Sequence, residues 1–189
     1  TRFLPPMFTE NPGRIKEVGP VLDYCLVGHM GESKNVEFVI ETFIALYQRG
    51  SKARMTFYGG TEERLEALRN RYDLPPNIQF KGIVDGVPYH HHQCYLSASY
   101  TELFANACVE ALNQGLLALL SDVEIAHRFY ANQSDAIRLF RNKGQLIQII
   151  EEMEQADYSH SNAENIALAS HYSLGTVAQG YRELLDRNF

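Results

Sequence analysis

The sequence has few cysteines, no long apolar run and no excess of positive charge, and each of these absences excludes a class of protein. Its three cysteines, Cys25, Cys94 and Cys108, stand far apart in apolar stretches without a CxxC pair. This pattern excludes a disulfide framework and favours buried thiols in a reducing compartment, so we expect a cytoplasmic location. No uninterrupted apolar run approaches the roughly 20 residues that a transmembrane helix needs, which excludes such a helix within these residues.

Positive charge is also scarce. Lysine and arginine together number 17 against 23 aspartates and glutamates, so the formal net charge is −6. A nucleic-acid-binding surface needs a stripe of basic residues for the phosphates, and we therefore expect no nucleic-acid partner. The 189 residues, 45% of them hydrophobic, are enough for one sizeable core and few for two. The composition thus predicts one globular domain and excludes general disorder.

The beginning of the chain differs from the rest. Of the seven prolines, four lie within residues 1–20, where no apolar period is visible. We interpret residues 1–20 as a linker and residues 21–189 as the domain. The chain starts at Thr1, without an initiator methionine or a signal-peptide pattern. We therefore expect a piece of a longer protein.

Short apolar runs that end in turn residues alternate with helical patterns from residue 24 onwards. The runs predict strands at 24–27, 55–58, 78–80, 94–96, 116–120 and 135–140. Amphipathic spacing and caps predict helices at 36–47, 62–72, 105–113, 145–153, 163–169 and 176–185, with a short helical stretch at 87–93. This alternation predicts an α/β fold: a single Rossmann-like, three-layer α/β/α domain with a mainly parallel sheet covered on both faces.

In an open parallel sheet, ligands bind beyond the carboxyl ends of the strands, where the strand order reverses. The first segment in such a position is 28–35, which carries Gly28, His29 and Lys34. Glycine lets the backbone approach a ligand, and exposed N–H groups with an ammonium can hold a phosphate. The spacing fits neither the GxGxxG dinucleotide fingerprint nor the phosphate loop, which disfavours a nicotinamide-binding domain. Alone, the segment is more typical of a solvated turn.

Two further turns follow predicted strands. Gly59 and Gly60 connect a strand to a helix, and the backbone of Gly82, Ile83 and Val84 is placed to read the edge of a base. Either turn alone is weak evidence of a site.

A fourth segment, 102–115, contains two glutamates. Glu102 lies in a loop or helix cap after a predicted strand, and Glu110 lies about two turns into the following helix. The neighbours of Glu110 are apolar, and a carboxylate on an apolar helix is costly unless it has a partner such as a ligand hydroxyl. Two glutamates eight residues apart decide nothing by themselves, and what gives the segment weight is its context of strand, loop glutamate, helix start and second glutamate.

Together these segments resemble the C-terminal, donor-binding half of family 4 retaining glycosyltransferases with the GT-B fold. Members of that family carry a Gly-Arg-x4-Lys turn, a Gly-rich turn, a Phe-x-Gly segment and a Glu-x7-Glu motif, in this order. The corresponding stretches here are 28–34, 59–60, 80–82 and 102–115, and 172–174 resembles the family's aromatic-Ser-aromatic start of a helix. The order and intervals agree over roughly residues 22–187, which is far more specific than any single motif.

The resemblance implies a role for each of these positions. Lys34 would neutralise the donor diphosphate, Glu102 would face the donor sugar, and these two are the implied catalytic residues. Glu110 would accept hydrogen bonds from the ribose. The turn at Gly82 would hold the base, and the amides near Asn106 would hold phosphate or sugar oxygens. The implied donor-binding residues are Gly28, His29, Lys34, Gly59, Gly60, Gly82, Ile83, Val84, Glu102, Phe104, Ala105, Asn106 and Glu110.

The resemblance also implies the reaction. A hexose-type sugar would pass from a nucleotide-diphosphate donor to an acceptor with retention, in polysaccharide or glycoconjugate biosynthesis, without a cofactor or a metal. The three consecutive histidines at 90–92 do not change this, because adjacent side chains point in different directions. A GT-B enzyme has two halves, so we expect that the acceptor-binding N-terminal half is missing, and that the 189 residues bind the donor without transferring sugar. Peripheral contact with the cytoplasmic membrane face would come through that missing half.

The sequence departs from the family pattern at two places. His29, offset by one position, stands for the family arginine, and a neutral imidazole is a poor substitute for a guanidinium. Arg54 and Lys81 are candidates for a replacement cation. Leu103 and Ala105 replace two glycines of the family motif. A second hypothesis therefore stays open: a non-catalytic nucleotide-binding or protein-interaction module of the same fold.

Overall fold

The computed structural model describes residues 20–101, 106–122, 131–134, 136–155, 161–173, 175, 176, 178, 179 and 182. Its strands are β1 (Asp23–Val27), β2 (Arg54–Tyr58), β3 (Ile78–Gly82), β4 (Cys94–Ser97), β5 (Leu117–Ser121) and β6 (Ile137–Phe140). Its α-helices are α1 (Val36–Gln48), α2 (Glu62–Arg71), α3 (Asn106–Asn113), α5 (Lys143–Met153) and α6 (Ser161–Ser170). Two short 3₁₀ helices are η1 (Glu32–Lys34) and η2 (Tyr89–His91).

These elements confirm the order that the sequence predicts. Each of the six strands and five α-helices lies within two residues of its predicted bounds. The helical stretch expected at 87–93 is only the single turn of η2. The helix expected at 176–185 lies mostly outside the described residues, although Ser173 accepts a hydrogen bond from the Thr176 N–H at 3.3 Å, as a residue that caps a helix does.

The six strands form one sheet in the order β3-β2-β1-β4-β5-β6, and every neighbouring pair is parallel. β1 is central, because Cys25 pairs with Thr56 of β2 on one side and with Tyr95 of β4 on the other. The chain runs outward from β1 to β3 and then returns to β4 on the opposite side of β1. The strand order therefore reverses between β1 and β4, which is where a parallel sheet offers a ligand site.

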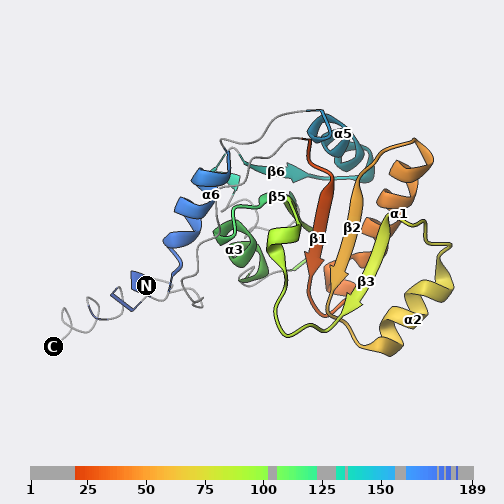
Figure 1. Cartoon of the computed structure of the whole chain (residues 1–189), viewed down its shortest axis with the longest axis horizontal. Coiled ribbons are helices and arrows are strands. Elements are labelled where there is room, and N and C mark those ends of the chain that lie inside the picture. Colours follow the sequence, from red (N-terminus) through yellow and green to blue (C-terminus); the bar gives the residue numbers. More distant parts are fainter. Residues whose placement is uncertain are drawn as a thin grey trace.

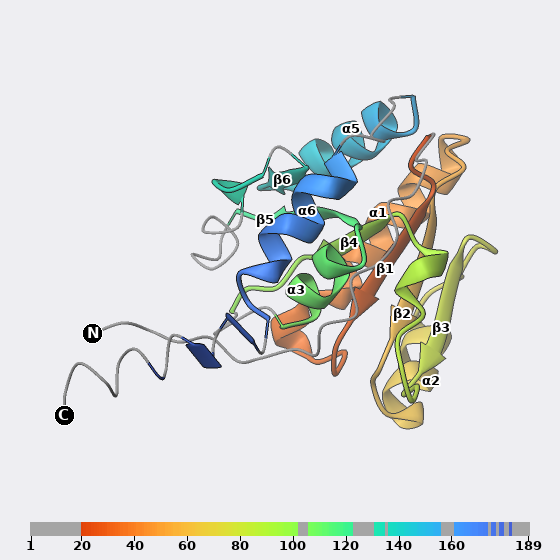
Figure 2. The same ribbon diagram turned by 60° about the vertical axis from the view of Figure 1, so that its left-hand side comes forward.

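Two apolar layers cover the two faces of this sheet. Successive side chains of a strand point to opposite faces, so Leu26 and Phe57 pack with α1, α2 and α5, whereas Cys25 and Tyr95 pack with α3 and α6. Helices α1 and α2 lie on one side of the sheet and α3 and α6 on the other (Figure 1). Figure 2 shows α3 and α6 side by side, in agreement with their contacts. The three-layer α/β/α prediction is therefore confirmed.

The outer strands β2 and β3 depart from the expectation of a sheet covered on both faces. Parallel sheets usually bury both faces, but here one face of these two strands carries Arg54, Thr56, Gln79 and Lys81, which line an open hollow of about 260 Å³. The opposite face carries buried residues such as Phe57. Because the open face is polar, it needs no covering helix.

Helix α2 begins after an N-cap residue, Thr61, which the sequence predicts. The Thr61 hydroxyl accepts a hydrogen bond from the Arg64 N–H at 3.3 Å and so satisfies one free donor of the first turn. We predict that Thr61→Ala lowers the free energy of unfolding by about 1 kcal/mol in urea denaturation. Thr61→Ser keeps the acceptor and is the matched control. An alanine variant as stable as the wild type would contradict this capping role.

Candidate functional site

The turn after β1 places a lysine against the backbone. The N–H of Gly28 donates to the Tyr58 carbonyl at 3.0 Å, which fixes the end of β1 beside β2. A Cβ placed on Gly28 would lie 3.0 Å from Cε of Lys34, so the stem of this lysine lies directly over the glycine. Lys34 is half-buried in η1. Its ammonium group is therefore held close to the carboxyl end of β1, where the sequence predicts a phosphate site.

Within the same turn, Met30 adopts an unusual backbone conformation. Its φ is 56°, a left-handed value that is uncommon outside glycine, and its side chain is fully buried. The Met30 carbonyl accepts a hydrogen bond from Nε of Arg64 at 2.9 Å, and Nη2 of Arg64 pairs with Glu37 at 2.6 Å. Arg64 thus ties the turn to α2 and α1. Sequence reasoning missed this role, because Arg64 stands in a charged helix like any solvated residue.

His29 is exposed in this turn. Its Nδ1 accepts a hydrogen bond from the Gly31 N–H at 3.0 Å. Because Nδ1 is engaged with the backbone, Nε2 is the ring nitrogen that a ligand can contact, and an imidazole lacks the permanent charge of an arginine.

The turns after β2 and β3 contact the turn after β1. The Gly59 N–H donates to the Gly82 carbonyl at 2.6 Å, and a Cβ on Gly59 would clash with the Gly28 carbonyl oxygen. A Cβ on Gly60 would lie 2.7 Å from Cγ of Met30. The φ values of Gly59, Gly60 and Gly82 are 101°, 81° and 66°, which glycine adopts readily. The structure thus brings together three turns that the sequence could only treat separately.

After β3 the chain exposes two apolar side chains. Ile83 is 80% exposed and Val84 is 37% exposed, directly after Gly82. Large apolar side chains at such a position are available to a flat apolar group. The base-binding role that the resemblance implies for this turn stays a prediction.

The turn after β4 is joined to the turn after β1 across the point where the strand order reverses. The Tyr100 N–H donates to the Ser33 carbonyl at 2.9 Å. Below it, the Ser97 and Ser99 hydroxyls lie 3.1 Å apart, and the Ser121 hydroxyl donates to the Ser99 carbonyl at 2.7 Å. These buried serines fix the backbone that leads to residue 102. Glu102, Phe104 and Ala105 lie outside the described residues.

Helix α3 presents Asn106 and Glu110, four residues apart, on one exposed face, while Cys108, Val109 and Leu112 point into the core. The expectation of a costly carboxylate on an apolar surface was wrong. Neighbours in the sequence point in different directions on a helix, so Glu110 leaves the apolar face to its neighbours. Its Oε2 accepts a hydrogen bond from the Tyr89 hydroxyl at 3.1 Å. Sequence reasoning missed this partner, because Tyr89 lies 21 residues before Glu110 in the chain.

Of the two candidate replacement cations, Arg54 and Lys81, Arg54 lies at the amino end of its strand, away from the carboxyl ends where a ligand would bind. Arg54 is the first residue of β2, and its Nε and Nη2 donate to the carboxylate of Asp23, the first residue of β1, at 2.7 and 2.6 Å. These hydrogen bonds raise the pKa of Arg54. Arg54 therefore cannot serve a ligand at the carboxyl ends. Lys81 lies one residue before the end of β3 and is exposed on the polar face.

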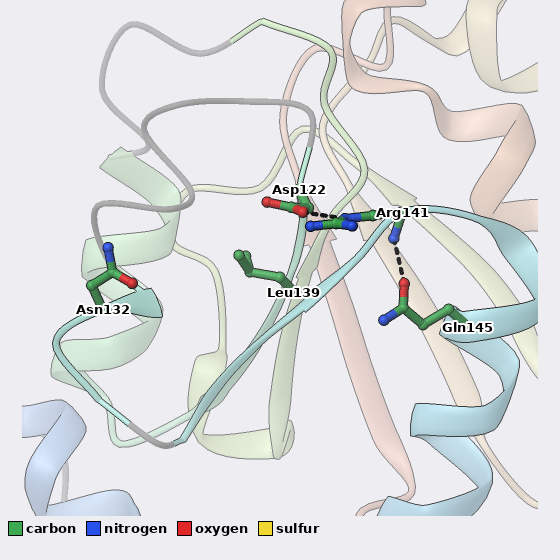
Figure 3. A pocket seen from close by; sticks show the side chains of 5 residues that line it. All are labelled: Asp122, Asn132, Leu139, Arg141 and Gln145. Carbon is green, nitrogen blue, oxygen red and sulfur yellow. Dashed lines mark hydrogen bonds and ion pairs between the residues drawn. The ribbon is translucent and has the colours of Figure 1, made fainter.

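A second hollow, of about 610 Å³, lies at the ends of β5 and β6. Figure 3 shows Arg141 between Asp122 and Gln145 in this hollow, and its Nε donates to Oδ2 of Asp122 at 2.5 Å. The Arg141 side chain is 76% exposed whereas Asp122 is 7% exposed. The guanidinium thus remains open to a ligand at the same edge of the sheet. Sequence reasoning missed both residues, although each directly follows a strand.

Among the described residues, no three His, Cys, Asp or Glu side chains are grouped so that they could hold a metal ion. His90 and His91 are exposed, with ring centroids 4.1 Å apart, whereas Nε2 of the buried His92 lies 2.8 Å from the Tyr58 hydroxyl. No helix in the described part of the chain is long and apolar enough to span a membrane.

Residues 22–155 match the model of the family described as glycosyl transferases group 1. This match covers more than two thirds of the chain and includes the turns after β1 to β4 and helix α3. Comparison with curated protein sequences gives no significant match.

Solved structures of glycosyltransferases have the same fold. The GtfA/B complex is similar over 89% of this chain and 36% of its own, with a TM-score of 0.75 and 18% identity. Anabaena Alr3699/HepE, solved with UDP and glucose, is similar over 87% of this chain and 48% of its own, with a TM-score of 0.71 and 15% identity. The pneumococcal O-GlcNAc transferase GtfA, solved with UDP and GlcNAc, is similar over 90% of this chain and 38% of its own, with a TM-score of 0.69 and 14% identity. This chain thus spans less than half the length of each.

The close approach of Gly59 to the Gly28 carbonyl oxygen can be tested by substitution. We predict that Gly59→Ala lowers the free energy of unfolding by more than about 2 kcal/mol, because the new Cβ meets a backbone oxygen and the left-handed φ is itself unfavourable. Urea denaturation measures this change. Gly86→Ala is the control, since a Cβ there has nothing within 4 Å, and should change stability by less than about 0.5 kcal/mol. Equal stability of the two variants would refute the close approach.

Proposed function

Because the chain belongs to the group 1 glycosyltransferase family, we propose that it binds the nucleotide-diphosphate sugar donor of a retaining glycosyltransferase. The observation that carries the proposal is the placement of Lys34 over Gly28, at the point where the strand order reverses. An ammonium group at the carboxyl end of the central strand is suited to a diphosphate, since it supplies positive charge to phosphate oxygens where parallel sheets bind ligands. The turns after β1 to β4 and the exposed face of α3 form the proposed site.

The proposed chemistry at the diphosphate is electrostatic. Lys34 stabilises the negative charge that develops on the departing nucleoside diphosphate, and His29 contributes a contact through Nε2. Local cations and amide groups can serve an anion even on a chain with a net charge of −6, because the field near the site depends on the nearest groups. We further propose that Glu102 faces the donor sugar, with the amides around Phe104 and Ala105 holding phosphate or sugar oxygens.

The remaining donor groups are assigned to the adjacent turns. The backbone of Gly82 and the exposed side chains of Ile83 and Val84 would hold the base, and Glu110 would accept hydrogen bonds from the ribose hydroxyls. Carboxylates accept hydrogen bonds well, and a diol offers two donors. Because two of the similar structures were solved with UDP, uridine diphosphate is the first nucleotide to test.

We propose that a further domain outside these 189 residues binds the acceptor. The similar structures are at least twice as long as the region that they share with this chain. We propose transfer of a hexose without a metal or another cofactor, in the cytoplasm, with contact to the membrane face through that further domain.

One observation favours a second candidate, a non-catalytic nucleotide-binding or interaction module. His29, whose Nδ1 is engaged with the Gly31 N–H, stands where the family pattern has the fixed positive charge of an arginine. A site with one ammonium group binds a diphosphate less tightly than a site with two cations.

Calorimetric titration with uridine, adenosine and guanosine diphosphates tests the donor site. We predict saturable binding of at least one of them, about tenfold weaker in Lys34→Ala and weakened at least as much in Glu110→Ala, since each variant removes a charged partner. Lys52→Ala is the matched control, because Lys52 is exposed at the opposite edge of the sheet. Absence of binding at millimolar nucleotide would sink the proposal, and binding without turnover in the longer protein would favour the module.

A second measurement separates donor binding from catalysis. We predict that the 189 residues alone show no sugar transfer to added acceptors, because the acceptor would bind to the further domain. A coupled assay for released nucleoside diphosphate measures this. Acceptor-dependent turnover by the isolated chain would contradict the proposed division between donor and acceptor domains.

A further inference from the structure

A hydrogen bond between two distant parts of the sequence fixes the carboxylate of Glu110. The Tyr89 hydroxyl lies 3.1 Å from Oε2 of Glu110 and 3.4 Å from the carbonyl oxygen of Ala107, both on α3. Tyr89 is the first residue of η2, directly after the segment that leaves β3. The contact therefore joins η2, which follows the segment 83–88 after β3, to the exposed face of α3.

Tyr89 is itself held firmly, so its hydroxyl has a defined position. The side chain is 7% exposed and packs in the apolar cluster that includes Cys108, Val109 and Leu112 of α3. Its N–H donates to the Val87 carbonyl at 2.8 Å, and its own carbonyl accepts from the His92 N–H at 2.9 Å. Ring and backbone are thus both constrained.

The direction of the hydrogen bond is also defined. Burial, with a contribution from the nearby Glu110 carboxylate, raises the pKa of the Tyr89 hydroxyl far above its usual value, so the hydroxyl remains a donor. Of its two acceptors, the carboxylate is the closer and carries charge, which makes it the stronger partner. A carboxylate has about four acceptor positions, so one bond from Tyr89 leaves room for both hydroxyls of a ribose.

We propose that Tyr89 is a positioning residue that holds the Glu110 carboxylate in the orientation that receives the ribose hydroxyls, and that couples this carboxylate to η2. The inference rests on the proposed function, which assigns the ribose to Glu110. Glu110 is exposed, and an exposed glutamate without this tether populates several side-chain rotamers. Tyr89 thus acts on nucleotide binding without contacting the nucleotide.

Tyr89→Phe removes the hydroxyl and keeps the buried ring. Calorimetric titration uses uridine, adenosine and guanosine diphosphates, each paired with its 2′,3′-dideoxy form. We expect the variant to bind the ribose form about fivefold more weakly, the usual effect of one lost hydrogen bond, and the dideoxy form unchanged. In a Glu110→Ala background, Tyr89→Phe should have less than about a twofold further effect, because the carboxylate that it positions is gone.

The chain offers a matched control in a second tyrosine–glutamate pair. The Tyr72 hydroxyl lies 3.5 Å from Oε1 of Glu41, between the end of α2 and helix α1 and away from the proposed ribose contact. Tyr72→Phe should leave the affinities for the ribose form and for the dideoxy form of each nucleotide unchanged.

A readout without ligand keeps the inference distinct from the proposed function. Three-bond NMR couplings that report χ1 of Glu110 should indicate one rotamer in the wild type and averaging in Tyr89→Phe. Unaveraged couplings in the variant, or equal losses for the ribose and dideoxy forms, would overturn the positioning role in favour of a purely structural one. If the couplings behave as expected but no nucleotide binds the wild type, the proposed function fails, and the ribose role of Tyr89 fails with it.

Discussion

The contact between the backbones of Gly28 and Gly59 determines the geometry of everything around the candidate site. Parallel strands β1 and β2 are held side by side by their hydrogen bonds, and their following turns can meet only if no side chain separates them. Glycine at position 59 allows this meeting, and the hydrogen bond from the Gly59 N–H to the Gly82 carbonyl extends it to β3. The turns contact one another directly, and the stem of Lys34 lies against the backbone of Gly28 in this cluster of turns. The position of the charge therefore follows from the backbone.

The electrostatic field at the candidate site is set by the nearest charged groups rather than by the net charge of the chain. The chain as a whole is acidic. Most of its arginines near the sheet are engaged with carboxylates, as Arg54 is with Asp23 and Arg64 with Glu37. Such pairs leave little field at a distance. The ammonium of Lys34 and the guanidinium of Arg141, whose side chain is 76% exposed although it pairs with Asp122, both lie at the carboxyl edge of the sheet, the edge to which ligands bind in folds of this kind.

The sequence predicted the sheet and its helices well, because buried parallel strands are short apolar runs and each is followed by a turn residue and an amphipathic helix. It also placed glycines and Lys34 in turns at the ends of strands, where the structure has them, and their assignment to a site stays a prediction. It could not predict contacts between distant segments. The pairing of Arg54 with Asp23 depends on strand register, and the bond from Tyr89 to Glu110 depends on how η2 packs on α3. The exposure of Glu110 was misjudged because sequence neighbours were taken as spatial neighbours, which a helix does not allow.

The substitution of His29 for an arginine has a consequence for how the proposed site would divide its binding energy. The turn itself does not need an arginine at that position, since Arg64 holds the Met30 carbonyl from α2. What would be lost is the permanent charge of a guanidinium toward the ligand. In the proposed site, with the diphosphate served by Lys34, discrimination of the nucleotide would fall more heavily on the ribose and the base. A carboxylate that receives the ribose would then gain from a fixed orientation, and the hydrogen bond from the buried Tyr89 hydroxyl to Glu110 is the contact that would provide it.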